Sequence, residues 1–450
     1  MRIITTTSDN EVFRTSGSVS EFLPDAAHRE LNILNIYPRE HFQTVIGFGG
    51  AVTDSSGWVY SRLPEESRRK FVDLCYGPDG LAYTLGRTHI DSCDFSVEMY
   101  CADDDKMDSG LERFDLSRCG KYVFPLLDDI MHERSELRLV LAPWSPPAYM
   151  KDNASRVGGG HLKKEYCDRW AKYICRYIAC MEKRGYSVFA LSAQNEPNAV
   201  QTWDSCLYSP EDERRFIYEY LHPALCDAGL DGVKLMIWDH NKERLFDRVD
   251  AICSHPEANA IVSAAGFHWY SGDHFDALRL VRHKYPDKLL IFTEGCIEYS
   301  RGDHNAQIIN ARRYAREILY GLNAGLNAFL DWNVLLDGQG GPNHVGNFCD
   351  APVMADIQSG KLTLNLSYHY IRHFSRYISP NAERLGVTYW DEDLPFCAVQ
   401  NPNGSVTAVL LNTSDDLRES YVRINGRIAH VVSPANSIST MLLEKAEVEL

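Results

Sequence analysis

Two glutamates stand at the ends of apolar runs whose length is typical of buried β-strands. Glu196 follows the run Val188–Ala193, and Glu294 directly follows the run Leu289–Thr293. Both runs belong to a pattern, described below, that predicts a closed parallel sheet, and the carboxyl ends of parallel strands meet at one end of such a sheet. We therefore expect the two carboxylates to project into the same opening.

Facing carboxyl groups of this kind can hydrolyse a glycosidic bond. One acts as the acid that protonates the leaving oxygen, and the other attacks the sugar or activates a water. Because repulsion between the charges raises the pKa of one group, we assign the protonated role to Glu196 and the nucleophilic role to Glu294. Asn195 can then donate to the sugar 2-OH. Either glutamate alone would be interpreted as a helix cap or a surface ion pair, but the two together favour catalysis.

The elements that must position these side chains are eight apolar runs that alternate with helix-length amphipathic stretches. The runs are Thr44–Phe48, Tyr83–Thr88, Leu137–Ala142, Val188–Ala193, Lys234–Trp238, Ala264–His268, Leu289–Thr293 and Ala328–Trp332. One helical candidate is Tyr166–Arg184, where large apolar side chains recur every three or four residues. An open doubly wound sheet usually has fewer strands and a glycine-rich nucleotide turn, whose spacing Gly47–Gly50 lacks. The expected fold class is therefore α/β, a (β/α)8 TIM barrel.

The two ends of the chain differ from its middle. Ile3–Tyr37 and approximately Glu383–Leu450 contain short strands separated by turn residues. We expect both chain termini to form one side β-sandwich domain. Its N-terminal strands would lie in residues 1–40, the catalytic barrel in residues 41–382, and the C-terminal part of the sandwich in residues 383–450.

Composition limits the partners. The formal charge of −16, from 62 acidic and 46 basic residues, disfavours nucleic acid and anionic membrane surfaces. The first residues lack the apolar run of a signal peptide, and no later stretch approaches 18 uncharged apolar residues, so we expect a soluble protein without membrane insertion. The 13 cysteines occur singly, without a CxxC pair, which argues against a disulfide framework and a zinc cage. A cytoplasmic location is expected. The sequence makes no prediction of oligomeric state.

Neither a metal nor another cofactor is expected. His369 and His373 are spaced i, i+4, but the glutamate of a zinc motif does not follow His369. The acidic segment Cys101–Asp105 lacks the alternating ligands of a calcium loop. Both features are interpreted as ordinary helix and loop positions.

A series of motifs in order along nearly the whole chain resembles the glucosylceramidase-type glycoside hydrolases of family 30, in the clan of (β/α)8 barrels. The motifs are Gly47–Asp54, Ser92–Ser96, Pro143–Pro147, Asn195–Pro197, His268–Tyr270, Thr293–Cys296, Asp331–Asn333 and Gly340–Asn343 with Asn347. The resemblance implies retention of anomeric configuration, a covalent intermediate on Glu294, and a terminal β-sandwich that packs on the barrel.

The same resemblance implies roles at matched positions. The residues expected to bind the terminal sugar are Asp94, Trp144, Trp332 and Asn347. Tyr270 is expected to hydrogen-bond Glu294, and Arg87 to lie behind that carboxylate and keep it ionised. His268 and Trp203 complete the expected substrate contacts, the latter on the leaving-group side, where the family varies.

Some positions keep a second interpretation. Trp144 and Trp332 could be core aromatics, and Asp94 could be the N-cap of a helix beginning at Phe95. The aspartates Asp54, Asp91 and Asp331 are interpreted as acceptors for buried backbone donors, and Trp238–His240 as a segment that could line the pocket.

The substrate is the least determined property. Relatives implied by the resemblance include β-glucosidases acting on glucosylceramide, β-xylosidases, β-1,6-glucanases and β-fucosidases. Asp94, Trp144 and Asn347 favour exo action on a terminal β-D-glucosyl unit of a small β-glycoside or oligosaccharide. Two other classes of function stay open, a non-catalytic sugar-binding barrel and a barrel of unrelated metal-dependent hydrolytic chemistry.

Overall fold

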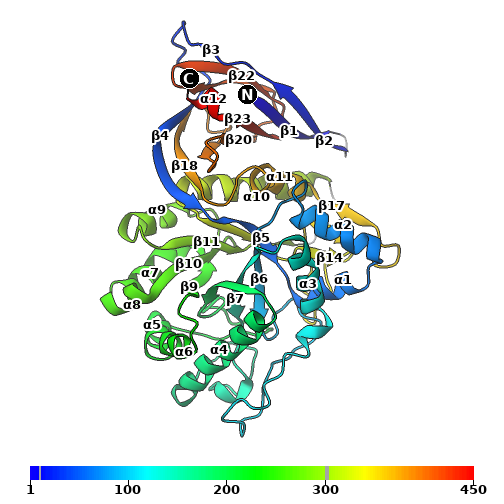
Figure 1. Ribbon diagram of the computed structural model, residues 1–450, viewed down its shortest axis with the longest axis vertical. Coiled ribbons are helices and arrows are strands. Elements are labelled where there is room, and N and C mark those ends of the chain that lie inside the picture. The colour runs from blue at the N-terminus through cyan, green and yellow to red at the C-terminus, as the bar shows by residue number, and fades with distance from the viewer. Residues whose placement is uncertain (10–11, 299–303, 450) are drawn as a thin grey trace.

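The computed structural model describes residues 1–9, 12–298 and 304–449. Figure 1 shows a β-sandwich above a barrel, with α10 (His304–Ala324) and α11 (Leu366–Ser375) lying between them. Both ends of the chain are in the sandwich.

A closed barrel of eight parallel strands forms the larger unit. Its strands are β5 (Gly47–Ala51), β6 (Leu85–Ile90), β7 (Arg138–Pro143), β8 (Ser187–Ser192), β9 (Lys234–Asn241), β10 (Val262–His268), β11 (Leu289–Glu294) and β13 (Ala328–Asp331). Seven of the runs predicted from sequence overlap seven of these strands closely, and the predicted α/β barrel is confirmed. The first run differs, because residues up to Val45 belong to β4 (Ile33–Val45) of the sandwich. Gly49 lets β5 approach β6, since a Cβ there would lie 2.1 Å from the carbonyl oxygen of Leu85.

Helices cover the outside of the barrel because each has one apolar face. In α4 (Cys167–Lys183), Trp170, Ile174 and Tyr177 are buried at helical spacing, as predicted. The other α-helices around the barrel are α1 (Asp54–Ser61), α2 (Glu65–Tyr76), α3 (Val123–Glu133), α5 (Pro210–Phe216), α6 (His222–Asp227), α7 (Leu245–Cys253), α8 (Pro256–Ile261) and α9 (Phe275–Lys284). The short helix α12 (Lys445–Val448) lies in the sandwich (Figure 1). None of the helices in the described residues is both long and apolar enough to span a membrane.

The sandwich is built from both termini, which confirms the expected arrangement. Its strands are β1 (Arg2–Asp9), β2 (Val12–Val19), β3 (Leu23–Pro24), β4, β18 (Ala382–Tyr389), β19 (Phe396–Gln400), β20 (Val406–Asn412), β21 (Arg418–Ile424), β22 (Arg427–Ser433) and β23 (Ser437–Leu443). β1 pairs antiparallel with β23, so that Ile3 lies opposite Met441. His373 of α11 contacts hydroxyls of Thr6 (2.8 Å) and Thr440 (2.7 Å) in these two strands, so this histidine ties the barrel to the sandwich.

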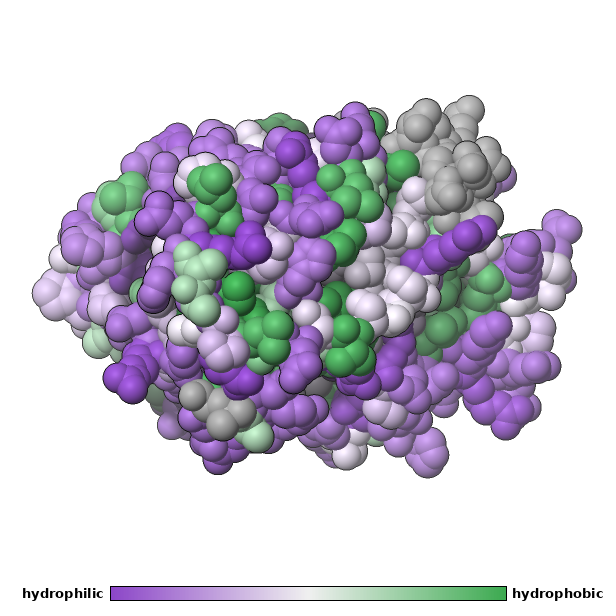
Figure 2. All heavy atoms as spheres, turned by 90° about the horizontal axis from the view of Figure 1, so that it is seen from above, coloured by the Kyte–Doolittle hydropathy of each residue, from purple (hydrophilic) through white to green (hydrophobic). Residues whose placement is uncertain are grey.

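Short ladders line the carboxyl end of the barrel. β12 (Ile297–Glu298) pairs with β15 (Cys349–Asp350), and β14 (Leu335–Asp337) and β17 (Leu362–Leu364) flank β16 (Val353–Ala355). These ladders hold the segments that follow β11 and β13 close together. Figure 2, a view from above, shows a largely hydrophilic face on which apolar side chains occur in small groups.

Candidate active site

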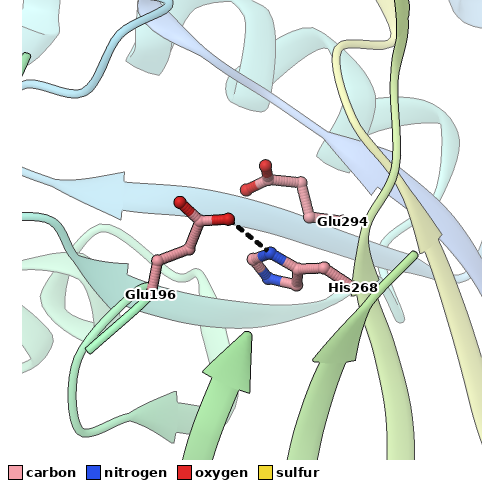
Figure 3. A group of neighbouring side chains, drawn as sticks. All are labelled: Glu196, His268 and Glu294. Atoms are coloured by element: carbon pink, nitrogen blue, oxygen red, sulfur yellow. Dashed lines mark hydrogen bonds and ion pairs between the residues drawn. The ribbon is translucent and has the colours of Figure 1, made fainter. Parts of the chain in front are cut away.

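Glu196 and Glu294 face each other across the mouth of the barrel (Figure 3). Glu294 is the last residue of β11, and Glu196 follows β8 in a left-handed backbone conformation (φ 47°) that its amide stabilises by donating to the carbonyl of Asp239 (3.0 Å). One carboxylate oxygen of each glutamate lies within 4.8 Å of the other. The fold therefore brings the two residues together as the sequence predicted.

Two donors hold the carboxylate of Glu294. Arg87, from β6, donates from Nη1 to Oε2 at 2.6 Å, and the hydroxyl of Tyr270 donates to Oε1 at 3.0 Å. Both residues lie where the sequence analysis placed them. Burial raises the pKa of Glu294, while the charges of His268 and Arg87 act in the opposite direction.

Glu196 has a different environment. Its Oε1 lies 3.1 Å from Nδ1 of His268 and 3.8 Å from Nε2 of His240. Burial alone would raise the pKa of Glu196, but the hydrogen bond from His268 and the two histidine charges outweigh it and lower the pKa. The expectation that repulsion from Glu294 raises the pKa of Glu196 is therefore wrong for the free protein, because the sequence did not reveal these histidine contacts.

Asp239 connects the cations of the site. Its carboxylate accepts from Arg87 (3.0 Å), His268 Nε2 (3.2 Å) and Thr293 Oγ1 (2.5 Å). Burial opposes ionisation of Asp239, but the charge of Arg87 and the bond from His268 dominate and lower its pKa. Burial likewise opposes the charge on His268, yet the charge of Glu294 and the bonds to Asp239 and Glu196 raise its pKa to about 9. His268 is thus an imidazolium at neutral pH, with both nitrogens donating.

The sequence indicated only that the segment Trp238–His240 could line the pocket. The predicted strand ended at Trp238, whereas β9 continues to Asn241 with Trp238 and Asp239 at positive φ (71° and 53°). The register with β10 shifts at this point, between Gly266 and Phe267. This irregularity directs Asp239 into the barrel. The sequence indicated this position only by placing an acidic residue at the end of an apolar run.

Glu196, His268 and Glu294 could in principle offer three ligand atoms to a metal, since these atoms lie within 4.8 Å of one another. However, both nitrogens of His268 are already hydrogen-bonded to carboxylates and its raised pKa keeps both protonated. A protonated imidazole nitrogen has no lone pair for a metal. The residues therefore fit an ion-pair network better than a metal centre, and the absence of a metal stays a prediction.

A cavity of about 570 Å³ opens beside the two glutamates. Among its lining residues are the predicted sugar ligands Asp94, Trp144, Asn195, Trp332 and Asn347. The rings of Trp144 and Trp332 are stacked, with centroids 5.4 Å apart, and both are almost completely buried. They form a wall of the cavity and part of an aromatic cluster at once, so the two interpretations of these tryptophans are compatible.

The polar ligands are held in defined orientations. Asp94 accepts from Asn347 Nδ2 at 3.2 Å, and burial together with the charges of Glu294 and Glu196 raises its pKa to about 8. Phe95 does not begin a helix, so the interpretation of Asp94 as an N-cap is wrong. Arg87 donates to Asn195 Oδ1 at 2.7 Å, which leaves the amide NH₂ as the group that can donate to a sugar hydroxyl.

The cavity has further lining residues, which are Gln201, Trp203, His240, Asn241, Ile309 and Arg313. Trp203 packs against the cluster that contains Trp144 and Trp332, and its contact with the leaving group stays a prediction. His268, predicted to contact substrate, is completely buried and reaches the cavity through its bond to Glu196. Cys296 and Cys349 also line the cavity, and nothing in the sequence indicated that they meet.

Asp54, Asp91 and Asp331 make structural contacts with neighbouring side chains and backbone amides. Asp54 pairs with Arg118 (2.8 Å), and Asp91 accepts from the hydroxyl of Tyr173 (2.8 Å) and the amide of Ala102 (3.0 Å). Asp331 accepts from the amide of Trp332 at 2.9 Å. These contacts hold the loops that carry the sugar ligands.

A (β/α)8 barrel with two facing carboxylates beside an aromatic-walled pocket defines the class of glycoside hydrolases. The comparison of the sequence with family models gives the family. The chain belongs to glycosyl hydrolase family 30, because the TIM-barrel domain of that family matches residues 45–378 and its beta sandwich domain matches residues 381–441.

Individual relatives span nearly the whole chain. Putative glucosylceramidase 4 of Caenorhabditis elegans is 30% identical over 424 residues, which cover 90% of this chain and 82% of that protein. The crystal structure of SrfJ from Salmonella typhimurium has a TM-score of 0.94 and 34% identity, covering 99% of this chain and 100% of that one. An endo-β1,6-glucanase of known structure has a TM-score of 0.88 and 26% identity, covering 99% of both chains. The family supports a retaining mechanism, whereas the substrates named for its members differ.

Proposed function

We propose that this protein is an exo-acting, retaining β-glycosidase that hydrolyses terminal β-D-glucosides, with Glu294 as nucleophile and Glu196 as acid/base. The observation that carries this proposal is the approach of their carboxylate oxygens to within 4.8 Å. Carboxyl groups about 5–5.5 Å apart are typical of retaining enzymes, whereas inversion needs about 6.5–9.5 Å to admit a water.

Hydrolysis proceeds in two displacements. In the first, Glu294 attacks the anomeric carbon while Glu196 gives a proton to the leaving oxygen, so the glycosidic bond breaks and a glycosyl ester forms on Glu294. In the second, Glu196 takes a proton from water, which attacks the same carbon and releases Glu294. Two inversions at one carbon give net retention.

The partners of the two glutamates support this division of roles. Arg87 and Tyr270 keep the carboxylate of Glu294 oriented as an anion that can attack. Glu196 instead contacts His268, whose imidazolium lies 3.1 Å away and can pass a proton to it when a leaving group must be protonated. His268 therefore acts on the substrate through Glu196.

The glycone pocket supports a terminal glucosyl unit. Because its pKa is about 8, Asp94 is mostly protonated at neutral pH and can both donate to and accept from adjacent sugar hydroxyls, with Asn347 beside it as a further donor. The stacked tryptophans offer the apolar surface that a sugar ring packs against. A relative named as a glucosylceramidase agrees with this choice.

Charge and cysteine content support a proposal for the leaving group and for the location. The charge of −16 disfavours an anionic membrane surface, so a small glucoside or oligosaccharide suits the chain better than a membrane lipid. All 13 cysteines are free thiols, which supports a cytoplasmic location.

Hydrolysis of a panel of p-nitrophenyl β-glycosides, each with and without EDTA, tests the proposal. We expect the β-glucoside to be preferred and EDTA to have no effect. Preference for a xyloside or fucoside would mean that the sugar bound next to the glutamates is xylose or fucose and not glucose. Inertness toward all aryl glycosides with cleavage inside a β-1,6-glucan would favour endo action, for which the endo-β1,6-glucanase is the structural precedent. Sugar binding without any turnover would indicate a non-catalytic barrel, and inhibition by EDTA a metal-dependent one.

A further inference from the structure

Two thiols meet inside the active-site cavity. The Sγ atoms of Cys296 and Cys349 lie 3.2 Å apart, and both residues line the cavity. The β12–β15 ladder, in which Ile297 pairs with Asp350, holds the two segments together. The contact is therefore a consequence of the backbone arrangement at the barrel mouth.

Each thiol is next to a group that acts on the sugar. Cys296 follows Glu294 by two residues, and its Sγ lies 3.4 Å from the hydroxyl of Tyr270, which donates to Glu294. Cys349 follows Asn347 by two residues, and Asn347 donates to Asp94. A bond between the thiols would thus join the segment of the nucleophile to the segment that binds the sugar.

We propose that Cys296 and Cys349 form an oxidisable pair, which hydrogen peroxide converts to a disulfide that lowers glycosidase activity. Cys296 is partly exposed and Cys349 buried, so peroxide reaches Cys296 first. Its thiolate attacks one peroxide oxygen, an S–O bond replaces the O–O bond, and water leaves. The Cys349 sulfur then attacks the sulfenic sulfur and expels a second water. The two thiols lose two electrons and two protons, and the peroxide is reduced to two waters.

The loss of activity follows from the change at Cys296. A disulfide brings the sulfurs from 3.2 Å to about 2.05 Å, and it removes the thiol proton that Cys296 can donate to the hydroxyl of Tyr270. The hydroxyl of Tyr270 then loses one of the groups that position it against Glu294. We therefore expect kcat/KM to fall roughly 3- to 10-fold, which is the range expected for the loss of one hydrogen bond of ordinary strength.

The rate of oxidation should depend on pH. The hydrogen bond with Cys349, and then burial, raise the pKa of Cys296, so its reactive thiolate is scarce at neutral pH. Among the described residues, Tyr270 also contacts Cys296, and burial raises the pKa of Tyr270 as well, while Glu294 adds a negative charge nearby. Oxidation should therefore be slow near pH 7 and accelerate toward pH 9.

The test treats the full-length protein with hydrogen peroxide at pH 7 and pH 9, followed by removal of peroxide. Peptide mapping without reduction locates the disulfide, and kcat/KM is measured before and after addition of dithiothreitol on whichever aryl glycoside the panel shows to be hydrolysed. The variants are Cys349→Ala and Cys296→Ser, and the matched control is Cys226→Ser, which changes an exposed thiol on α6.

We expect a Cys296–Cys349 linkage, a 3- to 10-fold fall in kcat/KM that dithiothreitol reverses, and faster loss at pH 9. Each pair variant should lose this reversible response relative to its own untreated activity, and Cys226→Ser should retain it. Absence of the linkage after treatment would overturn the proposal, as would a mapped linkage with unchanged activity. The peptide map does not need turnover, so a failed glucosidase proposal and a failed disulfide proposal give different results.

Discussion

Because folding raises the pKa of His268, the free energy of unfolding should depend on pH. The folded pKa of about 9 lies above the ordinary value of 6.5, and the residue is completely buried. A histidine whose pKa is raised by folding stabilises the folded state fully below the unfolded pKa, and this stabilisation is lost as pH rises through the folded pKa. The difference between about 9 and 6.5 corresponds to roughly 3.5 kcal/mol at about 1.4 kcal/mol for each pH unit.

Most of this stabilisation, about 2.5 kcal/mol, should disappear between pH 7 and pH 10. The perturbation is His268→Gln, which keeps a hydrogen-bonding side chain but cannot carry the charge. Urea unfolding of both proteins across this pH range gives the free-energy difference between them, and we expect that difference to shrink by about 2.5 kcal/mol.

His373→Gln is the matched control. Burial lowers the pKa of His373 to about 3, so this histidine is neutral throughout the same pH range. Its substitution should change the free energy of unfolding by an amount that does not vary between pH 7 and pH 10. A pH-independent difference for His268→Gln as well would refute the assignment of an imidazolium to the active site.

Three further predictions concern turnover. Glu294→Gln should reduce kcat on the order of 10⁴-fold or more with unfolding unchanged, and substantial remaining activity would mean that the nucleophile is elsewhere. Glu196→Ala should lose far more activity on an alkyl glucoside than on a 2,4-dinitrophenyl glucoside, and azide should rescue it to give the β-glucosyl azide. An α-azide product from that variant would show that the two roles are reversed. Asp94→Ala should lower kcat/KM for a β-glucoside roughly 10- to 100-fold, and an effect below 2-fold would remove Asp94 from the sugar contacts.

The barrel could be predicted because its signals are local. Each strand is a short apolar run, and each helix has the matching periodicity, so the order of elements follows from the sequence alone. The first strand was misplaced because β4 and β5 are separated by the single residue Ile46, so that the predicted run Thr44–Phe48 spans the change from sandwich to barrel. Asp94, Trp144, Asn195, Glu196, Glu294 and Trp332 line one cavity for the same reason, since each lies at or just beyond the carboxyl end of a barrel strand.

The parts that were missed depend on contacts between distant segments. Asp239 points into the barrel because Trp238 and Asp239 both have positive φ. Neither residue is a glycine, which would have indicated such a backbone conformation in the sequence. The pKa of Glu196 depends on His268, which is 72 positions away, and the meeting of Cys296 with Cys349 depends on a two-residue ladder. Such effects follow from tertiary packing, which residue types and spacing do not specify.

The ionic cluster of the site has a property that none of its members has alone. Arg87 and His268 supply positive charge to a cluster that also contains the carboxyl groups of Glu196, Asp239 and Glu294. These carboxyl groups lie beside the place where the sugar becomes cationic, and negative charge there stabilises an oxocarbenium-like transition state. If His268 passes its proton through Glu196 to the leaving oxygen, the cluster becomes more negative at the moment that positive charge develops on the sugar. Asp239 makes this transfer possible, because it accepts from both cations and so keeps the imidazole in place after its proton has left.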